Sequence, residues 1–236
     1  MFDIVYIIKS NADPEELRYS LRSVCKNFQY NKVWIYGNCP DGIFPDKFVK
    51  IDQKGNTPWA KVSYTLKQIF ENDEITKDFW LFNDDFFIIK PFRLETENSY
   101  RTYINGTIFK HIEEIIKRNK GRSKYTEQLR AVRRLLEVKG IDTLNYAMHI
   151  PILINRQKGI ETMEEFPDVP MFRCLYGNMH RIPAILHEDV KIADTTSIPK
   201  EEWIFTSTLD GSFKTGNIGK YIRNMFPEKC KYESIL

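Results

Sequence analysis

The first 90 residues alternate between apolar runs and amphipathic stretches, which predicts strands and helices in turn. Apolar runs at residues 3–9, 32–36 and 79–82 have the length of strands that are covered on both faces. A shorter run at 48–52 indicates another strand, and residues 86–89 indicate one more after a sharp bend. The order strand, helix, strand, strand, helix, strand is typical of an α/β sheet.

Two amphipathic stretches between these strands carry helix start signals. Asp13 and Pro14 precede the first, as an N-cap and a first-turn proline, and Thr57 and Pro58 precede the second in the same way. The apolar residues that recur at helical spacing are Leu17, Leu21, Val24 and Phe28 in the first helix, and Trp59, Val62, Leu66, Ile69 and Phe70 in the second.

Polar residues stand directly after three of the predicted strands. Ligands of such sheets bind beyond the carboxyl ends of the strands. We therefore expect these positions to converge on one pocket and to contact a substrate. They are Lys9, Ser10 and Asn11 after the first strand, Gly37 and Asn38 after the second, and Asn83 with the two aspartates that follow it after the fourth.

Asp84 and Asp85 form an acidic pair between two apolar runs. Adjacent carboxylates in apolar surroundings are costly unless something neutralises them, and Mg²⁺ or Mn²⁺ does so with oxygen ligands. A metal bridged to a diphosphate would help a leaving group depart. The alternative is a water-facing turn, because Asn-Asp-Asp also suits a turn between strands. The position at the end of a fourth strand favours the metal site.

Residues 105–140 predict two helices joined by a polar break, which we expect to form an insert resting on the sheet. The pair carries many cations, among them Lys117, Arg118, Lys120, Arg122, Lys124, Arg130, Arg133 and Arg134. They form either solvated helix faces or a surface for an anionic acceptor.

The last third of the chain contains strand candidates at residues 182–186, 190–193 and 203–207. Residues 210–223 follow, with three glycines and the cations Lys214, Lys220 and Arg223. This composition indicates either a flexible loop that binds phosphate or a surface loop with a helix cap. The spacing is not that of a Walker motif.

Composition narrows the classes of protein. The 236 residues are 42% hydrophobic, which supports a real core and argues against a disordered chain. A net charge of +3 is less lopsided than that of many nucleic-acid binders. Four cysteines without zinc-site spacing suggest free thiols in a reducing compartment. No segment has the length of a membrane span or the features of a signal peptide, so we expect a soluble, cytoplasmic protein.

Two strings resemble conserved regions of the Stealth family of sugar-1-phosphate transferases. The string Leu-Arg-Tyr-Ser-Leu-Arg-Ser at 17–23, with the strand at 32–36, is similar to one region, as is Phe-Asn-Asp-Asp-Phe-Phe at 82–87. The resemblance covers about residues 1–92. It extends more weakly to His149-Ile150-Pro151 and Phe172-Arg173, which look like a later region with its histidine and arginine.

The resemblance implies a GT-A-like, Rossmann-like mixed sheet flanked by helices, with Mn²⁺ or Mg²⁺ at the acidic pair. The family's first strand ends in Trp-Val-Asp, whereas Ile8-Lys9-Ser10-Asn11 stands here. The leading hypothesis is therefore a metal-dependent glycosyltransferase that uses a nucleotide-sugar donor. The acceptor would be a polysaccharide, a teichoic-type polymer or a modified base in DNA. The alternatives are a Stealth-like sugar-1-phosphate transferase and a non-enzymatic module that binds nucleic acid or a partner.

The same resemblance assigns further roles. Asp85, His149 and Arg173 are the catalytic candidates, and Asp84, Asp85 and His187 are the metal candidates. Arg18 and Trp59 join the substrate-binding candidates, although each also has a structural explanation, as a surface cation and as a core residue. We expect a single domain, with a nucleotide-sugar-binding half at 1–95, the helical insert at 105–140, and an acceptor half at 145–236 that ends in the phosphate loop.

Overall fold

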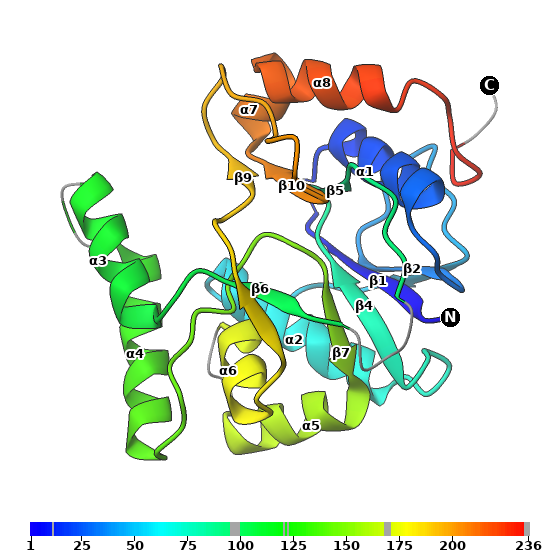
Figure 1. The fold of residues 1–236 in the computed structure, drawn as a ribbon. Helices are drawn as coiled ribbons and strands as arrows, with labels where there is room; N and C mark the ends of the chain where they lie inside the picture. Colours follow the sequence, from blue (N-terminus) through cyan, green and yellow to red (C-terminus); the bar gives the residue numbers. More distant parts are fainter. Residues whose placement is uncertain (11, 95–99, 120, 122, 168–170, 234–236) are drawn as a thin grey trace.

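A five-stranded sheet with the strand order β3-β2-β1-β4-β7 forms the centre of the computed structural model (Figure 1). The structure describes all residues except 11, 95–99, 120, 122, 168–170 and 234–236. Strands β1 (Asp3–Ile8), β2 (Val33–Gly37), β3 (Lys47–Lys50) and β4 (Asp78–Phe82) are parallel. Strand β7 (Ile152–Asn155) pairs with β4 in the antiparallel sense.

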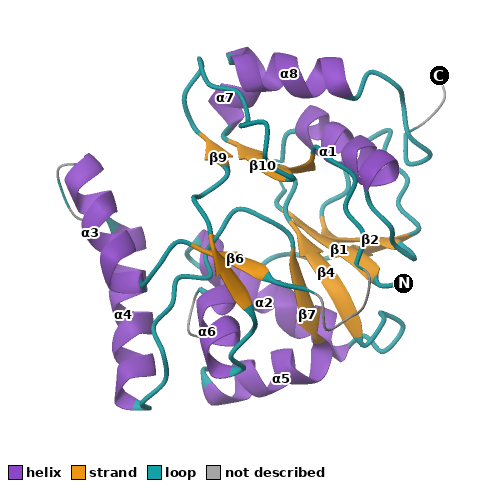
Figure 2. Cartoon of the chain, viewed as in Figure 1, coloured by secondary structure: helices purple, strands orange, loops and turns teal. Residues whose placement is uncertain are grey.

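Two smaller sheets complete the strand framework (Figure 2). The first has the order β5-β10-β9, with β5 (Phe86–Ile88), β10 (Phe205–Thr208) and β9 (Lys191–Ile192). The second pairs β6 (Thr102–Ile104) with β8 (Ala184–Leu186). Because β5 follows β4 after three residues, the acidic pair lies at the junction between the central sheet and the first small sheet.

Helices cover both faces of the central sheet. Leu17 and Leu21 of α1 (Pro14–Asn27) pack on one face, together with the β5-β10-β9 sheet. The other face is covered by α2 (Pro58–Glu71), α5 (Arg156–Glu165) and α6 (Phe172–Met179). The expected mixed α/β sheet flanked by helices is therefore confirmed.

The predicted helix starts are confirmed as well. The Asp13 side chain accepts a hydrogen bond from the Glu15 amide at 2.9 Å, and the Thr57 hydroxyl accepts one from the Ala60 amide at 3.1 Å. Each cap satisfies one of the backbone N–H groups that the first turn of a helix leaves without an intrahelical partner.

The helical insert consists of α3 (Ile108–Asn119) and α4 (Lys124–Val138), but it does not rest on the sheet as expected. Its apolar stripe packs instead on α6, where Ile112 and Leu129 share a cluster with Leu175. The central sheet already buries its two faces under other helices, so the insert covers α6 and stands to one side of the molecule (Figure 1).

The expected C-terminal phosphate loop is helical, which corrects the prediction for residues 210–223. Helix α7 (Asp210–Thr215) leads directly into α8 (Asn217–Met225). Phe213, Ile218 and Ile222 are fully buried against the core on the α1 side. Gly216 and Gly219 therefore permit close packing of two short helices, and the segment does not form an open loop.

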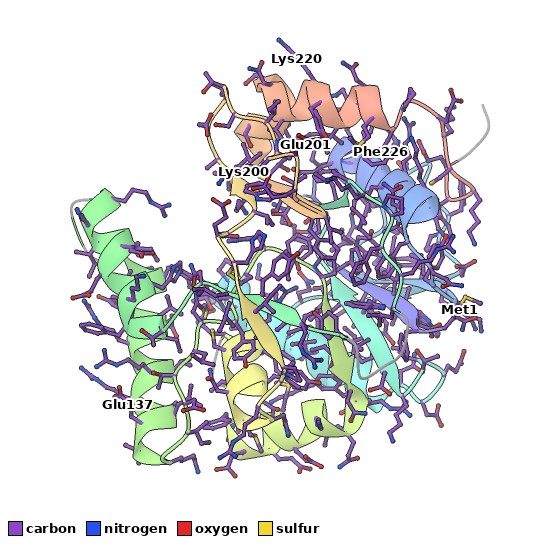
Figure 3. The ribbon with its side chains drawn as sticks, viewed as in Figure 1. Met1, Glu137, Lys200, Glu201, Lys220 and Phe226 are labelled. Atoms are coloured by element: carbon purple, nitrogen blue, oxygen red, sulfur yellow. The ribbon has the colours of Figure 1, made fainter. Side chains whose placement is uncertain are left out.

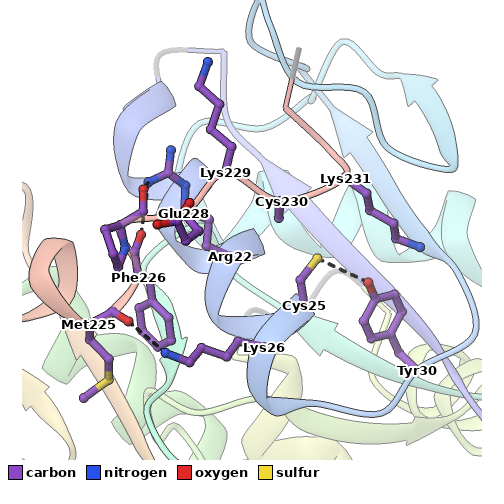
Figure 4. A pocket seen from close by; sticks show the side chains of 11 residues that line it. Arg22, Cys25, Lys26, Tyr30, Met225, Phe226, Glu228, Lys229, Cys230 and Lys231 are labelled. Carbon is purple, nitrogen blue, oxygen red and sulfur yellow. Dashed lines mark hydrogen bonds between the residues drawn. The ribbon is translucent and has the colours of Figure 1, made fainter. Parts of the chain in front are cut away.

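A tether joins the C-terminal segment to α1. Arg22 binds both carboxylate oxygens of Glu233, each at 2.7 Å. Arg22 also donates to the carbonyl oxygen of Phe226, and both residues are labelled in Figure 4. A cavity of about 410 Å³ lies beside this tether. Its walls come from α1 and the C-terminal segment and contain none of the candidate site residues named above.

Gly37 sets the spacing between the ends of β1 and β2, which yields a stability prediction. Its φ is +111°, and an added Cβ would lie 2.1 Å from the carbonyl oxygen of Ile8. We expect Gly37→Ala to lower the free energy of unfolding by at least about 2 kcal/mol in urea titrations, because strain and a backbone clash combine. The control is Gly211→Ala in α7, where nothing lies within 4 Å of the added Cβ, and we expect it to stabilise by up to about 1 kcal/mol. Equal stability of the two variants would contradict the prediction.

Candidate functional site

The predicted substrate positions converge at one edge of the central sheet. Strands β2, β1 and β4 are parallel neighbours, so their carboxyl ends lie side by side. Gly37 is in register with Ile8, and the Asn38 amide donates to the carbonyl oxygen of Ile8 at 3.1 Å. Lys9 and Ser10 continue beyond β1 and are exposed, whereas Asn11 lies outside the described residues.

A tight turn at residues 83–85 carries the chain from the central sheet to the small sheet. The Phe86 amide donates to the carbonyl oxygen of Asn83 at 3.4 Å, which closes the turn. On its far side, the Ser20 hydroxyl of α1 donates to the carbonyl oxygen of Phe86 at 2.5 Å. These bonds and the two strands hold Asp84 and Asp85 at the sheet edge.

The small sheet supplies the partners of Asp85. Phe86 in β5 is in register with Ser207 in β10, and Ser207 with Lys191 in β9. The Asp85 Oδ2 atom accepts from the Ser207 hydroxyl at 3.0 Å and pairs with the Lys191 ammonium at 3.1 Å. The Oδ1 atom is buried and has no hydrogen-bond partner among the described residues. One oxygen of this carboxylate is therefore available to a ligand.

Asp84 lies in surroundings that disfavour its charge. Burial and the neighbouring Asp85 carboxylate raise the pKa of Asp84 to about 6, and the positive charge of Lys9 offsets part of this rise. Lys9 after β1 and Asp84 after β4 thus interact across the sheet edge, as the expected convergence of strand ends requires.

Glu16 of α1 is a third carboxylate in the same region. Its side chain is 2% exposed and accepts a hydrogen bond from the Thr208 hydroxyl of β10. Burial raises the pKa of Glu16 to about 8, the Thr208 bond opposes this rise, and the charges of Asp85, Asp84 and Asp210 add to it. Four carboxylates therefore interact here, and at neutral pH Glu16 retains its proton.

Asp84 and Asp85 offer the kind of oxygen ligands with which proteins commonly bind Mg²⁺. Among the described residues, no group of three or more His, Cys, Asp or Glu side chains is arranged to hold a metal ion, so His187 does not complete a site with Asp84 and Asp85. Mg²⁺ is commonly bound by one or two carboxylates, with substrate phosphates and water completing its shell. The unpartnered Asp85 Oδ1 and the raised pKa of Asp84 match such a donor set.

A cavity of about 190 Å³ lies on the other side of the turn. It brings together four sequence-predicted residues: Trp59, Asn83, His149 and Arg173. Trp59 in the first turn of α2 stacks on Tyr125 of α4, with ring centroids 5.9 Å apart. The helical insert thus contributes a wall to this cavity, which neither segment reveals by itself.

His149 is held in one orientation by an acidic partner. Its Nδ1 atom lies 2.8 Å from Asp189 Oδ2. Burial alone would raise the pKa of Asp189, but hydrogen bonds from the side chain and amide of His149 hold it below its ordinary value. An ionised carboxylate accepts only, so Nδ1 carries the proton and the neutral ring keeps its lone pair on Nε2.

Arg173 reaches the same cavity from α6. Its Nη1 atom donates to the carbonyl oxygens of Met148 and Ile150 at 2.8 and 2.5 Å, and the guanidinium lies 5.2 Å from the centroid of the Phe86 ring. Burial lowers the pKa of Arg173 to about 10. The two hydrogen bonds to backbone carbonyls therefore fix the orientation of the Arg173 guanidinium, whose positive charge is poorly solvated in these buried surroundings.

Other predicted residues have structural partners. Lys214 pairs with Asp13 at 3.2 Å, and Arg223 binds Glu15 at 2.8 and 2.9 Å, so both connect the C-terminal helices to the start of α1. His187 stacks on Tyr103 at 4.1 Å. Two more candidates lie on other helices: Lys220 is exposed on α8 (Figure 3), and Arg18 of α1 donates to the carbonyl oxygen of Asp41.

Several residues of the site were not predicted. Glu16 lies in the first turn of α1, where an acidic residue suits the start of a helix, and nothing in its spacing indicates that it is buried. Lys191 and Ser207 reach Asp85 through the pairing of β9, β10 and β5, which the sequence does not specify. Two acidic residues, 188 and 189, directly follow His187 in the sequence, which indicates that one of them could be the partner of a histidine. The histidine that Asp189 contacts in the structure is His149.

Comparisons with known proteins give matches among solved structures. No protein-family model and no curated protein sequence matches the chain. An apo-form structure of the glycosyltransferase GlyE from Streptococcus pneumoniae TIGR4 is similar at 13% identity and a TM-score of 0.37, covering 78% of this chain and 44% of that one. Another GlyE structure is similar at 12% identity and a TM-score of 0.39, covering 80% and 46%. The chain thus spans less than half the length of these structures, and at these TM-scores the resemblance carries no conclusion about activity.

Among the helices that the structure describes, none combines the length and apolar character needed to cross a bilayer.

Replacing Glu16 by glutamine tests the acidic region through pH. Between pH 4.5 and about 8 the folded protein keeps a proton that Glu16 has lost in the unfolded chain, so the free energy of unfolding falls as pH rises. We expect Glu16→Gln to gain stability relative to the natural protein across this window, by at most about 1.4 kcal/mol per pH unit. Urea unfolding at pH 5, 6.5 and 8 without divalent ions measures it.

The exposed Glu71→Gln in α2 is the matched control, and its stability difference from the natural protein should stay constant across these pH values. If the difference in the free energy of unfolding between Glu16→Gln and the natural protein is also independent of pH, the pKa of Glu16 is not raised.

Proposed function

We propose that this protein is a metal-dependent glycosyltransferase that takes a sugar from a nucleotide-sugar donor. The observation that carries the proposal is the Asp84–Asp85 turn, with its unpartnered Asp85 Oδ1 at the carboxyl edge of a parallel sheet. The parallel strands follow the order 3-2-1-4, as in doubly wound α/β sheets, and such sheets bind ligands beyond the carboxyl ends of their strands. The proposal includes the assignment of this sheet to a GT-A-like fold.

Asp84 and Asp85 would hold Mg²⁺ or Mn²⁺ against the donor diphosphate. The ion, when bound, would neutralise the negative charge that develops on the departing nucleoside diphosphate. Lys9 acts on the charge of Asp84 and Lys191 pairs with Asp85, and the ammonium groups of both lysines can bind phosphate oxygens. Lys191 would then serve the leaving group, a role that the sequence had assigned to Lys214, Lys220 and Arg223.

The cavity beside the turn would receive the acceptor. His149 presents Nε2 as a proton acceptor because Asp189 occupies Nδ1, so it can take the proton from an acceptor hydroxyl as that hydroxyl attacks the sugar. Asn83 belongs both to the turn and to the cavity wall, so donor and acceptor would meet at this residue. The acceptor polymers expected are a polysaccharide, a teichoic-type polymer or a modified base in DNA.

Metal-dependent donor binding is the first experiment. We expect Mn²⁺ to raise the melting temperature by several degrees at pH 8 and by much less at pH 5.5, because Asp84 and Glu16 hold protons at the lower pH. A screen of UDP-, GDP-, CMP- and dTDP-sugars should find one that adds to the shift only with metal. Asp84→Asn and Asp85→Asn should lose both responses, and the exposed Asp73→Asn should keep them. Donor binding that survives loss of either aspartate would refute the metal site.

Product analysis tests the type of bond made. If the donor is a UDP-, GDP- or dTDP-sugar, glycosyl transfer should release a nucleoside diphosphate, measured by chromatography of the nucleotide fraction. Release of a nucleoside monophosphate with a phosphodiester in the product would instead establish sugar-1-phosphate transfer. His149→Ala should lower kcat by a factor of about 10² to 10⁴ if the histidine acts as general base, with little change in donor affinity.

A further inference from the structure

Two buried polar atoms in the wall of the 190 Å³ cavity have no hydrogen-bond partner among the described residues. They are Ser63 Oγ, on a side chain that is 6% exposed, and Arg173 Nη2. Leaving a buried donor without a partner costs free energy, and native proteins contain few such groups. Two of them in one cavity indicate a polar ligand that the chain itself does not supply.

The charge of Arg173 defines the sign of that ligand. Among the described residues, no carboxylate forms an ion pair with Arg173 within 4.0 Å, although the charges of Asp85 and Asp189 act on it from further away and offset part of the lowering of its pKa by burial. Its Nη1 atom is occupied by two backbone carbonyls, which fix the plane of the guanidinium and leave Nη2 free. An anionic group is the partner that would satisfy both the charge and the free N–H groups.

The rest of the wall defines the body of the ligand. Trp59, Leu66 and Phe172 are among the apolar side chains that line the cavity. A cavity of about 190 Å³ suits a ligand of about the size of one sugar ring with its substituents. Apolar walls with few convergent polar groups are typical of small-molecule sites.

We infer that this cavity binds a monosaccharide unit that bears a carboxylate or a phosphate. Arg173 binds the anionic group, and Ser63 forms a hydrogen bond with another polar atom of the same sugar. The inference rests on the proposed function, because the bound unit is the acceptor's terminal sugar, with one hydroxyl facing His149. It adds the substrate class, which is an acidic sugar acceptor.

Calorimetric titration of the full chain, without metal or donor, tests the inference directly. The probes are glucuronic acid, glucose 6-phosphate and uncharged glucose. We expect one of the two anions to bind at least tenfold more tightly than glucose, and the preferred anion distinguishes a sugar acid from a sugar phosphate. Equal affinity for glucose, or no binding of either anion, would overturn the inference.

Two variants locate the binding in the cavity. Arg173→Gln should abolish the preference for the anion over glucose, and Ser63→Ala should weaken anion binding about fivefold, the effect of one neutral hydrogen bond. Ser63→Ala removes an unpartnered atom and should fold at least as stably as the natural protein, so it decides the matter if Arg173→Gln does not fold. Arg134→Gln, which changes an exposed cation of α4, should leave the affinity unchanged. If Ser63→Ala and Arg173→Gln both keep the full affinity for the anionic sugar, the sugar binds outside this cavity.

Donor binding on the same proteins separates this inference from the proposed function. Ser63→Ala should bind the metal and the nucleotide sugar normally, and Asp85→Asn should still bind the anionic sugar. Donor binding without anion binding would overturn the acceptor class alone. Anion binding without donor binding would overturn the glycosyltransferase proposal and leave an acidic-sugar site.

Discussion

The site depends on one constraint, which is the three-residue turn that links two sheets. Residues 83–85 leave the central sheet at β4 and enter the small sheet at β5, so Asp84 and Asp85 stand where neither sheet can satisfy both charges. The bond from Ser20 to Phe86 and the pairing of β5 with β10 prevent this turn from moving into solvent. The raised pKa of Asp84 and the unpartnered Asp85 Oδ1 follow from that position.

The same turn separates two regions of opposite electrostatic character. On one side, Asp84 and Asp85 stand beside the protonated Glu16, and Lys9 and Lys191 balance part of the negative charge of the two aspartates. On the other side, Arg173 is a buried cation without a carboxylate partner among the described residues. The proposed transferase would use this division, because a metal-bound diphosphate and an acceptor would have to be bound separately and still meet at one bond. Asn83 lies at the boundary between the two regions.

Local signals predicted much of the first 90 residues. Asp13 and Thr57 cap their helices as expected, and the apolar runs became β1, β2 and β4, because capping and hydrophobic pattern act over a few residues. Residues 210–223 show the opposite case, since glycine and charge content suggested a loop. Burial of Phe213 and Ile222 makes the segment helical, and burial depends on distant partners.

The sequence by itself determined the elements at the sheet edge and the presence of an acidic pair after the fourth strand. Local propensity and strand order suffice for both. Only the tertiary structure decided which side chains face that pair and which form the cavity. Lys191 reaches Asp85 across 106 residues of chain, and Trp59 meets Tyr125 of the helical insert. Such contacts depend on strand pairing and helix packing between distant segments, which no local pattern in one sequence encodes.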